Sequence, residues 1–223
     1  MTKEERLQKL KDRAKALRGF ENEYREAGHR IIAGVDEVGR GPLAGPVVTA
    51  CVILPEDYEG LGIDDSKKLS EKKREELYSE IMENAICYGF GLCDNNVIDK
   101  VNILEATKLA MKQAVQAAEE SLIKNGKGER IDLVLVDAVT IPGIETKQIS
   151  MIKGDANSIS IAAASILAKV KRDRMMREYA DIYPGYDFAS NKGYGTAAHY
   201  AGIKERGLTP IHRRTFLKNI EDK

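Results

Sequence analysis

Four acidic side chains stand where strands or turns are expected to end, and their residue types suit metal-dependent chemistry: Asp36, Glu37, Asp137 and Asp155. A buried carboxylate is costly without a positive partner, yet only Lys153 stands within two residues of any of them. A bound cation would supply that partner. Carboxylates without His or Cys favour Mg²⁺ or Mn²⁺ over zinc. Two such ions about 3.5 to 4 Å apart can activate water and stabilise the leaving oxygen of a phosphodiester.

Each of these acids also has a structural alternative. A carboxylate at a strand end, such as Asp137, often only caps a turn, and Asp155 could satisfy the free amides of the helix expected next. Adjacent strand residues point to opposite faces, so Asp36 and Glu37 can share a site only if their strand ends or bends there. The glycine-rich stretch that follows them makes such an ending plausible.

Apolar periodicity and turn residues divide the chain into alternating strands and helices. Amphipathic helical segments, one or two, are expected within residues 1–29, and short helices among loops in the last 40 residues. The other expected helices cover residues 70–84, 102–124 and 157–180, and strands are expected at residues 30–36, 46–54, 85–93, 133–137 and 148–153. This alternation predicts an α/β fold, a sheet covered by helices on its faces.

The bulk composition is that of a globular protein, with 43% hydrophobic and 31% charged residues in 223. One principal domain with a small appendage is expected at this length. No apolar run approaches the roughly 20 residues that span a bilayer, and the charged beginning is unlike a signal peptide, so a cytoplasmic protein is expected. The cysteines Cys51, Cys87 and Cys93 form an odd set without close spacing, which predicts reduced structural thiols.

The formal net charge is zero, but the charge is unevenly distributed. Residues 1–30 hold nine Lys or Arg against six Asp or Glu, and residues 192–223 hold seven against three. Basic ends around an acidic middle suit a protein that grips phosphates at its rim and gathers carboxylates at its centre. Charged, solvated helices at both ends would explain the same pattern, and the sequence leaves this alternative open.

Residues 34–46 read GVDEVGRGPLAGP, which closely resembles the signature of the ribonuclease HII family. Further segments resemble that family in the expected order: DSKKL at 65–69, the strand ending in Asp137, KGDANSISIAAASILAKVKRD at 153–173, KGYGT at 192–196 and HRRTF at 212–216. The resemblance spans about residues 31–216 and leaves residues 1–30 outside. The sister family, ribonuclease HIII, departs at the Gly-Arg-Gly run and carries a sizeable folded domain ahead of it, so HII is favoured.

The resemblance implies a ribonuclease-H-like mixed sheet flanked by helices, with a small helical C-terminal region. The expected division is an N-terminal helical extension (1–30), a catalytic domain (31–185) and a substrate-binding region (186–223). By this resemblance Asp36, Glu37, Asp137 and Asp155 are catalytic ligands of two Mg²⁺ or Mn²⁺ ions. The implied monomeric endonuclease hydrolyses the RNA strand of RNA/DNA hybrids and nicks duplex DNA at embedded ribonucleotides. It leaves 3′-hydroxyl and 5′-phosphate ends, and it would remove misincorporated ribonucleotides and RNA primers.

Recognition of ribose requires donors or acceptors at the 2′-hydroxyl, the only group that distinguishes it from deoxyribose. Glycines beside Arg40 let the backbone approach a nucleotide closely. The family resemblance gives this task to Gly39, Arg40 and Gly41, with Tyr194 of KGYGT as the distant partner that stacks near the sugar. Without the resemblance, Tyr194 could equally be a locally packed loop aromatic.

Basic and hydroxyl side chains offer further contacts to the nucleic acid backbone. Ser66, Lys67 and Lys169 are candidate phosphate ligands, although a helical lysine such as Lys169 is usually just solvated. His199 and His212 fall in the basic C-terminal segment, where weak phosphate contact or an ordinary surface position is expected, and neither is assigned a catalytic role. The rival interpretations are another nuclease or transposase-like enzyme of the same fold and a non-catalytic hybrid-binding module, against which the four acids argue.

Overall fold

The computed structural model describes residues 2–125 and 129–218 and contains a mixed five-stranded sheet in the order β3-β2-β1-β4-β5. β1 (Ile32–Val38) pairs antiparallel with β2 (Val47–Ile53), which pairs antiparallel with β3 (Cys87–Cys93). β4 (Leu133–Asp137) lies parallel to β1 on its other side, and β5 (Lys147–Met151) extends the sheet in parallel. The predicted mixed sheet is confirmed.

The parallel pair β1 and β4 decides where the acidic residues meet. In the register of this pair Val35 lies beside Val136, so the next residues, Asp36 and Asp137, follow at the same edge of the sheet. Carboxyl ends of neighbouring parallel strands form the usual place for a site in an open α/β sheet. Two segments about 100 residues apart are therefore brought together by strand pairing alone.

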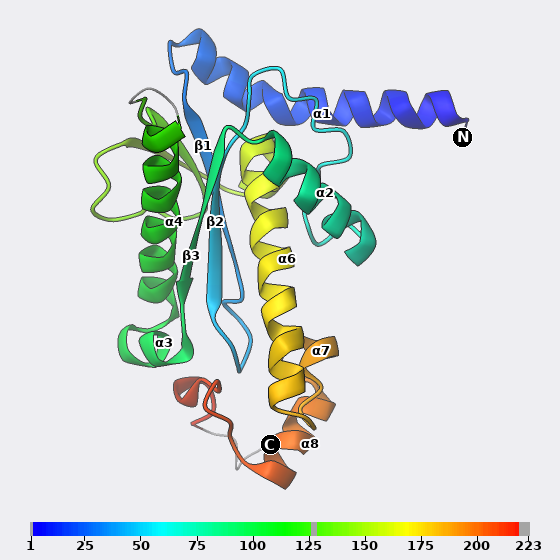
Figure 1. Ribbon diagram of the computed structural model, residues 1–223, viewed down its shortest axis with the longest axis vertical. Coiled ribbons are helices and arrows are strands. Elements are labelled where there is room, and N and C mark those ends of the chain that lie inside the picture. The colour runs from blue at the N-terminus through cyan, green and yellow to red at the C-terminus, as the bar shows by residue number, and fades with distance from the viewer. Residues whose placement is uncertain (1, 126–128, 219–223) are drawn as a thin grey trace.

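Two long helices cover the two faces of the sheet, with α4 (Ile103–Asn125) on one side and α6 (Ile159–Ile182) on the other (Figure 1). Both approach the strands closely because glycines face them. A Cβ added to Gly34 would overlap the backbone of Ser160 on α6, and one added to Gly91 would overlap the Ala110 carbonyl on α4. Close packing of α6 on β1 fixes that helix beside the strand that carries Asp36.

Three smaller helices pack around the sheet and α6. α2 (Glu71–Asn84) begins at the predicted cap, Ser70, whose hydroxyl accepts from the Lys73 amide, and it packs on α6. α3 (Asn95–Val101) was not predicted; it is separated from α4 by Asn102, which has a φ of 69°. The four-residue helix α5 (Gly154–Asn157) precedes α6, whose N-cap is Ser158.

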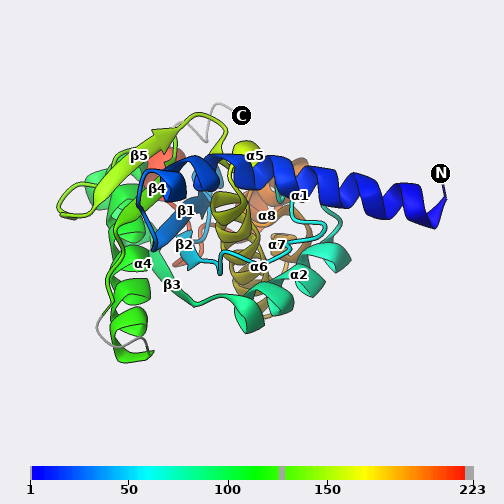
Figure 2. The same cartoon turned by 90° about the horizontal axis from the view of Figure 1, so that it is seen from above.

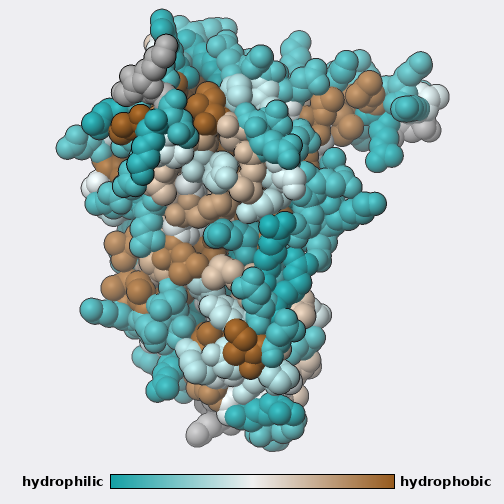
Figure 3. Space-filling view, viewed as in Figure 1, coloured by the Kyte–Doolittle hydropathy of each residue, from teal (hydrophilic) through white to brown (hydrophobic). Residues whose placement is uncertain are grey.

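The N-terminal segment forms a single helix, α1 (Lys3–Glu26). Its first half projects beyond the domain, while its second half crosses above α5 at one end of the sheet (Figures 1 and 2). The projecting half is mainly hydrophilic and carries a small apolar patch (Figure 3). Leu7 on this helix is half-exposed. Ala14, Leu17 and Glu21 are buried, so the C-terminal half of α1 belongs to the core.

The chain beyond α6 folds into α7 (Phe188–Asn191), α8 (Ala197–Arg206) and a 3-10 turn, η1 (Arg214–Phe216), as predicted for short helices among loops. These pack around a small core that includes Tyr186 and Phe188, whose rings stack at 5.3 Å. The three cysteines are free and buried, as predicted. Within the described ranges no helix is both long and apolar enough to cross a membrane.

Candidate active site

Asp36 and Glu37 lie within β1, which continues to Val38. The expectation that the strand would end at Asp36 was therefore wrong; the chain turns only at Gly39, where φ is +93°. Asp36 is buried, and burial raises the pKa of its carboxyl well above the usual value, with further increases from the charges of Glu37 and Asp137. Burial likewise raises the pKa of Glu37. The charge of Arg40 lowers that pKa, and the charge of Asp137 raises it further. Negative charge is thus concentrated at the ends of β1 and β4.

Asp36 is supported from α6 and from the DSKKL loop. The Ser165 hydroxyl hydrogen-bonds Asp36, which favours its ionised form, and the Oγ atoms of Ser165 and Ser66 lie 2.8 Å apart. Ser66 is only 3% exposed. This position favours a role in orienting Asp36 through Ser165 over the direct phosphate contact expected for Ser66. Ser165 was missed, although a hydroxyl inside the apolar run of α6 was a visible signal.

Asp137 and Asp155 are joined through the turn before α6. Asp137 Oδ1 accepts from the Gly154 amide at 2.8 Å, and Lys153 precedes it in the left-handed conformation with φ 58°. Asp155 follows in the first turn of α5, 7% exposed, with the Lys67 ammonium 3.5 Å from Oδ2. Burial raises the pKa of Asp155, and the neighbouring charge of Asp65 adds to it while Lys67 opposes it.

The donor set formed by these side chains suits hard divalent cations, since it consists of carboxylate oxygens that repel one another, with Asp36 and Asp155 buried and Glu37 and Asp137 half-buried. As the side chains stand, no group of three or more His, Cys, Asp or Glu within the described residues is in position to hold a metal ion. Asp137 is hydrogen-bonded to the Gly154 amide, and Asp155 is paired with Lys67. The oxygen donors of these residues fit Mg²⁺ or Mn²⁺ chemically.

The glycine-rich run and the distant tyrosine lie side by side. A Cβ placed on Gly41 would be 3.4 Å from Tyr194 Cε1, and the Leu43 amide donates to the Gly193 carbonyl at 2.8 Å. The Tyr194 side chain is half-exposed. Arg40, three residues after Glu37, places Nη1 3.4 Å from Glu37 Oε1. Segments 150 residues apart in the chain thus form one surface beside the acidic cluster.

The two candidate phosphate lysines differ in environment. The Lys67 side chain is highly exposed and its ammonium faces the acidic cluster, where Asp155 and Asp65 raise its pKa against the opposing effect of partial burial. Lys169 is mostly buried and its Nζ lies 2.6 Å from Asp173 Oδ1. Only Lys67 is directed toward the acids, while Lys169 is engaged on α6 itself.

Sequence reasoning placed His199 and His212 on the surface, and this was wrong. Both are fully buried, with exposures of 0% and 1%, and their Nε2 atoms lie 3.0 Å apart. Arg172 and Arg213 were not singled out at all, yet both guanidiniums are buried against the 39–46 loop. Residue type alone predicts a surface position for these side chains; burial became evident only from the fold.

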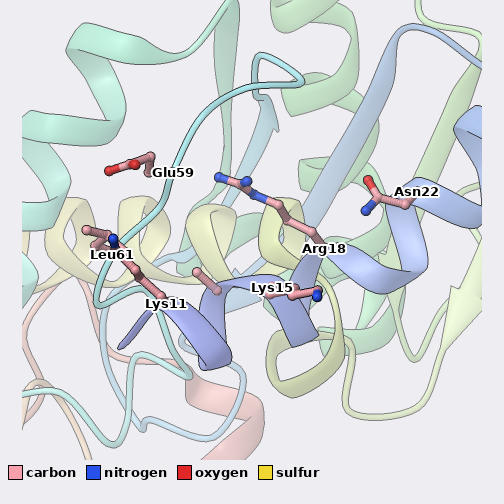
Figure 4. A pocket seen from close by; sticks show the side chains of 7 residues that line it. Lys11, Lys15, Arg18, Asn22, Glu59 and Leu61 are labelled. Carbon is pink, nitrogen blue, oxygen red and sulfur yellow. The ribbon is translucent and has the colours of Figure 1, made fainter. Parts of the chain in front are cut away.

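A separate basic pocket lies between α1 and residues 59–61 (Figure 4). It is lined by Lys11, Ala14, Lys15, Arg18, Asn22, Glu59 and Leu61. In Figure 4 the Arg18 side chain extends from α1 toward the loop that carries Glu59. None of the predicted site residues lines this pocket, so it is distinct from the acidic cluster.

A mixed sheet with carboxylates at the ends of adjacent parallel strands, one of them buried, is typical of metal-dependent nucleases of the ribonuclease-H-like class. Residues 33–219 match the family model for Ribonuclease HII, and the chain belongs to that family. It is thus an endoribonuclease, a divalent-metal-dependent hydrolase that acts on RNA/DNA hybrids.

Bacterial ribonucleases HII are similar in sequence to this chain over most of their length. The chain is 55% identical to a ribonuclease HII of Enterococcus faecalis over 91% of this chain and 75% of the relative. It is 50% identical to that of Clostridioides difficile, over 96% and 80%. The crystal structure of ribonuclease H2 from Pyrococcus horikoshii OT3 superposes with a TM-score of 0.66 at 29% identity, covering 86% of this chain and 98% of that one.

A further solved structure supports the fold only. It is the PCNA:RNase HII complex from Archaeoglobus fulgidus, with a TM-score of 0.68 at 24% identity, covering 86% of this chain and 98% of that chain. Together these comparisons favour the HII interpretation over an unrelated nuclease of the same fold and over a non-catalytic binding module.

Proposed function

We propose that Asp36, Glu37, Asp137 and Asp155 hold two divalent ions, Mg²⁺ or Mn²⁺, and that the protein cleaves RNA in hybrids and at ribonucleotides embedded in duplex DNA. When bound, the ions supply an activated water and charge stabilisation for the leaving oxygen, which gives 3′-hydroxyl and 5′-phosphate ends. The observation that carries this proposal is that strand pairing brings Asp36, whose carboxyl is buried and has a raised pKa, beside Asp137 at the ends of β1 and β4, while Gly154 links Asp137 to the turn that carries Asp155.

The residues around the acids hold them in place. A hydrogen bond from Ser165 opposes the rise in the pKa of Asp36, and the Ser66 hydroxyl lies within hydrogen-bond distance of Ser165. Arg40 lies beside Glu37 at the start of the glycine-rich run. Lys67 is exposed and lies next to Asp155. Its ammonium can bind a substrate phosphate after its ion pair with Asp155 opens. For Ser66 and Lys169 a supporting role fits their buried contacts better than a phosphate contact.

Ribose selectivity in this proposal belongs to Gly39, Arg40 and Gly41 together with Tyr194. The close approach of Gly41 to the tyrosine ring supports it, because a sugar lying on Tyr194 would meet the backbone of the run. Backbone amides and a stacked aromatic are groups that recognise a sugar and its 2′-hydroxyl. Such a site would let the enzyme excise misincorporated ribonucleotides and RNA primers.

The remaining proposals concern organisation. We infer an N-terminal extension (1–30), a catalytic domain (31–185) and a C-terminal substrate-binding region (186–223) in a monomeric, cytoplasmic enzyme. The position of Tyr194 between α7 and α8 supports the assignment of substrate binding to the C-terminal part. The buried half of α1 shows that the first segment shares its core with the second.

Cleavage mapping tests the function directly. Two duplexes of identical sequence are compared, one all-DNA and one with a single ribonucleotide, in Mg²⁺ or Mn²⁺ and with EDTA as the control. We expect one nick at the ribonucleotide, with a 3′-hydroxyl end, and none in the DNA duplex or in EDTA. Equal cleavage of both duplexes would refute ribose selectivity, and undiminished cleavage in EDTA would refute metal dependence.

A further inference from the structure

Two arginines lie completely buried beneath the glycine-rich run. Arg172 on α6 and Arg213 just before η1 both have 0% exposure and are among the largest fully buried side chains. Moving a charged guanidinium from water into the protein interior costs on the order of several kcal/mol, unless hydrogen-bond partners replace the water molecules that it loses. Throughout residues 2–125 and 129–218 no carboxylate lies within 4.0 Å of either guanidinium. Both charges must therefore be compensated by other groups.

The compensating groups are backbone carbonyls. Arg213 donates to the carbonyls of Gly39 at 2.5 Å, Arg40 at 2.8 Å and Gly45 at 2.8 and 3.0 Å. Arg172 donates to those of Pro46 at 2.9 Å, Lys192 at 2.9 Å and Ala44 at 3.2 Å. All but one of these acceptors belong to residues 39–46, and the exception, Lys192, opens the KGYGT segment that carries Tyr194. The two arginine side chains therefore hold residues 39–46 and the segment that carries Tyr194 in a fixed position relative to each other.

This arrangement fixes the direction of two amides. In a planar trans peptide the N–H points opposite to the C=O of the same unit. Because the carbonyls of Gly39 and Arg40 are directed inward at Arg213, the amides of Arg40 and Gly41 are directed away from it. Within the described part of the chain neither amide donates a hydrogen bond. By contrast, the Leu43 and Gly45 amides of the same loop are both used internally.

The glycine at position 39 is explained by the same contact. A Cβ on Gly39 would overlap the Nε and Cδ atoms of Arg172, and φ is +93° there. The sequence suggested that this glycine lets a nucleotide approach closely. In the structure it gives room to a buried arginine, whereas Gly41, facing the Tyr194 ring, is the glycine open to a ligand.

We propose that Arg172 and Arg213 are positioning residues for ribose recognition, turning the carbonyls of the 39–46 loop inward so that the Arg40 and Gly41 amides face the 2′-hydroxyl. This inference rests on the proposed function, because it gives those amides the role of reading the sugar. Burial lowers the pKa of Arg172 to about 10, and burial together with Arg172 lowers that of Arg213 to about 9. Both remain charged at neutral pH and add positive potential beneath the loop that meets the nucleic acid.

A purely structural role for these arginines makes a different prediction. If they only stabilised the fold, their replacement would lower the folded fraction, and every activity of a preparation would fall in proportion. A positioning role changes recognition within the folded molecules. The ratio between the affinities for two duplexes, measured in one preparation, is independent of the folded fraction, so it separates the two roles.

The test uses the full chain with Arg213→Lys and Arg172→Lys, which keep the charge but lose the fork that reaches several carbonyls. Binding affinities for the single-ribonucleotide duplex and for the matched all-DNA duplex are compared in EDTA, in which neither duplex is cleaved. We expect the ratio of the two affinities to fall at least about tenfold, which corresponds to about 1.4 kcal/mol of lost discrimination. Affinity for the all-DNA duplex should stay within about twofold, because the surface lysines are untouched.

Arg177→Met is the matched control, since Arg177 lies on the same helix as Arg172 but is exposed and pairs with Glu71 and Glu75. It should leave the ratio unchanged. If the lysine variants do not fold, Gly39→Ala, which pushes a Cβ onto Arg172, replaces them and should lower the ratio in the same way. Amide hydrogen exchange of residues 39–46 should also rise in each positioning variant relative to the rest of the sheet.

An unchanged ratio in folded variants, or a proportional loss on both duplexes, would overturn the proposal and leave the arginines as structural residues. Failure of the proposed function appears elsewhere: the wild-type enzyme itself would then show no preference for the ribonucleotide duplex. The two failures are therefore distinguishable in the same experiment.

Discussion

The imidazoles of His199 and His212 face each other with 3.0 Å between their Nε2 atoms. The Thr209 amide donates to His212 Nδ1 at 2.9 Å, so His212 must carry its proton on Nε2 and donate it to His199. His199 then has its proton on Nδ1, which lies 2.9 Å from the Tyr194 carbonyl. A buried chain of neutral imidazoles thus holds the backbone of the tyrosine proposed to lie on the ribose, with tautomers assigned from the hydrogen bonds.

This pair should make stability depend on pH. Burial and the neighbouring His199 lower the pKa of His212 to about 4, against about 6.5 in an unfolded chain. Because the folded-state pKa is the lower one, the unfolded state binds more protons in this window, and His212 stabilises less as pH falls from about 6.5 toward about 4. We expect the melting temperature of the metal-free protein to drop by several degrees over this range.

The raised pKa values of Asp36, Glu37 and Asp155 act in the opposite direction, so the comparison must be made between variants. His212→Gln removes the imidazole and leaves the acids in place. Its melting temperature should decline less than that of the wild type between pH 6.5 and 4. Parallel curves for the two proteins would contradict the assignment of this pH dependence to His212.

Asp36→Asn and Asp155→Asn should abolish cleavage without abolishing binding. Each substitution removes one negative charge from the acidic cluster while preserving side-chain size, so cation affinity falls and the basic surface is unchanged. We expect the rate on a hybrid to fall at least about a hundredfold, about 2.7 kcal/mol of barrier, with hybrid affinity within a fewfold. Exposed Asp181→Asn on α6 is the control. A wild-type rate in either variant would exclude that residue from the metal site.

Tyr194→Ala should reduce selectivity more than affinity. The ring lies against Gly41 and is half-exposed, so its removal opens the sugar site without disturbing the core. We expect the preference for a ribonucleotide duplex over an all-DNA duplex to fall about tenfold. This estimate follows because stacking on an aromatic ring contributes on the order of 1 to 3 kcal/mol. Tyr194→Phe separates the ring from the hydroxyl. An unchanged preference in Tyr194→Ala would mean that the tyrosine serves packing only.

Much of the sheet could be predicted because its signals are local. The strand 133–137 was predicted with the bounds that β4 has, since a continuous apolar run ending in Asp is typical of a buried parallel strand. Ser70 likewise marked the start of α2. α3 was missed because it is short and ends at Asn102, whose positive φ breaks the pattern that α4 then resumes. Such a break depends on one residue and leaves no periodic signal.

The site divides in the same way between local and tertiary information. Acids at strand ends are visible in the sequence, and pairing of β1 with β4 brings two of them together. The groups that hold the site were not predictable from residue type, because Arg213 and His212 look like surface residues in a basic segment. Their burial depends on carbonyls and ring nitrogens supplied by loops distant in sequence, and only the folded chain places those acceptors.

Leu17→Ala should show that α1 is part of the core. Leu17 is fully buried, whereas Leu7 on the same helix is 44% exposed. Loss of a buried leucine side chain typically costs about 2 to 5 kcal/mol, while Leu7→Ala should change the free energy of unfolding by less than about 0.5 kcal/mol. Urea denaturation measures both. Equal stability of the two variants would mean that α1 packs only loosely on the domain.

The charge of α1 can be tested without removing the helix. Deletion of residues 1–30 would also remove Leu17 and break the Arg13 contacts to Asp64 and to the Ala156 carbonyl next to Asp155, so a loss of binding would be ambiguous. Replacing the three exposed lysines Lys9, Lys11 and Lys15 with Gln avoids this.

If those lysines contact phosphates, each neutralisation should weaken hybrid binding and make the slope of log K against log salt shallower by about 0.7 to 0.9. The triple variant should therefore lose about 2 to 3 from that slope, with its melting temperature and its maximal cleavage rate at saturating hybrid unchanged. Binding titrations from 50 to 200 mM salt, roughly the range over which phosphate contacts dominate, provide the measurement. An unchanged slope would mean that these lysines do not contact phosphates. The role of α1 would then be to stabilise the Asp155 turn and the 64–67 loop through its packing contacts.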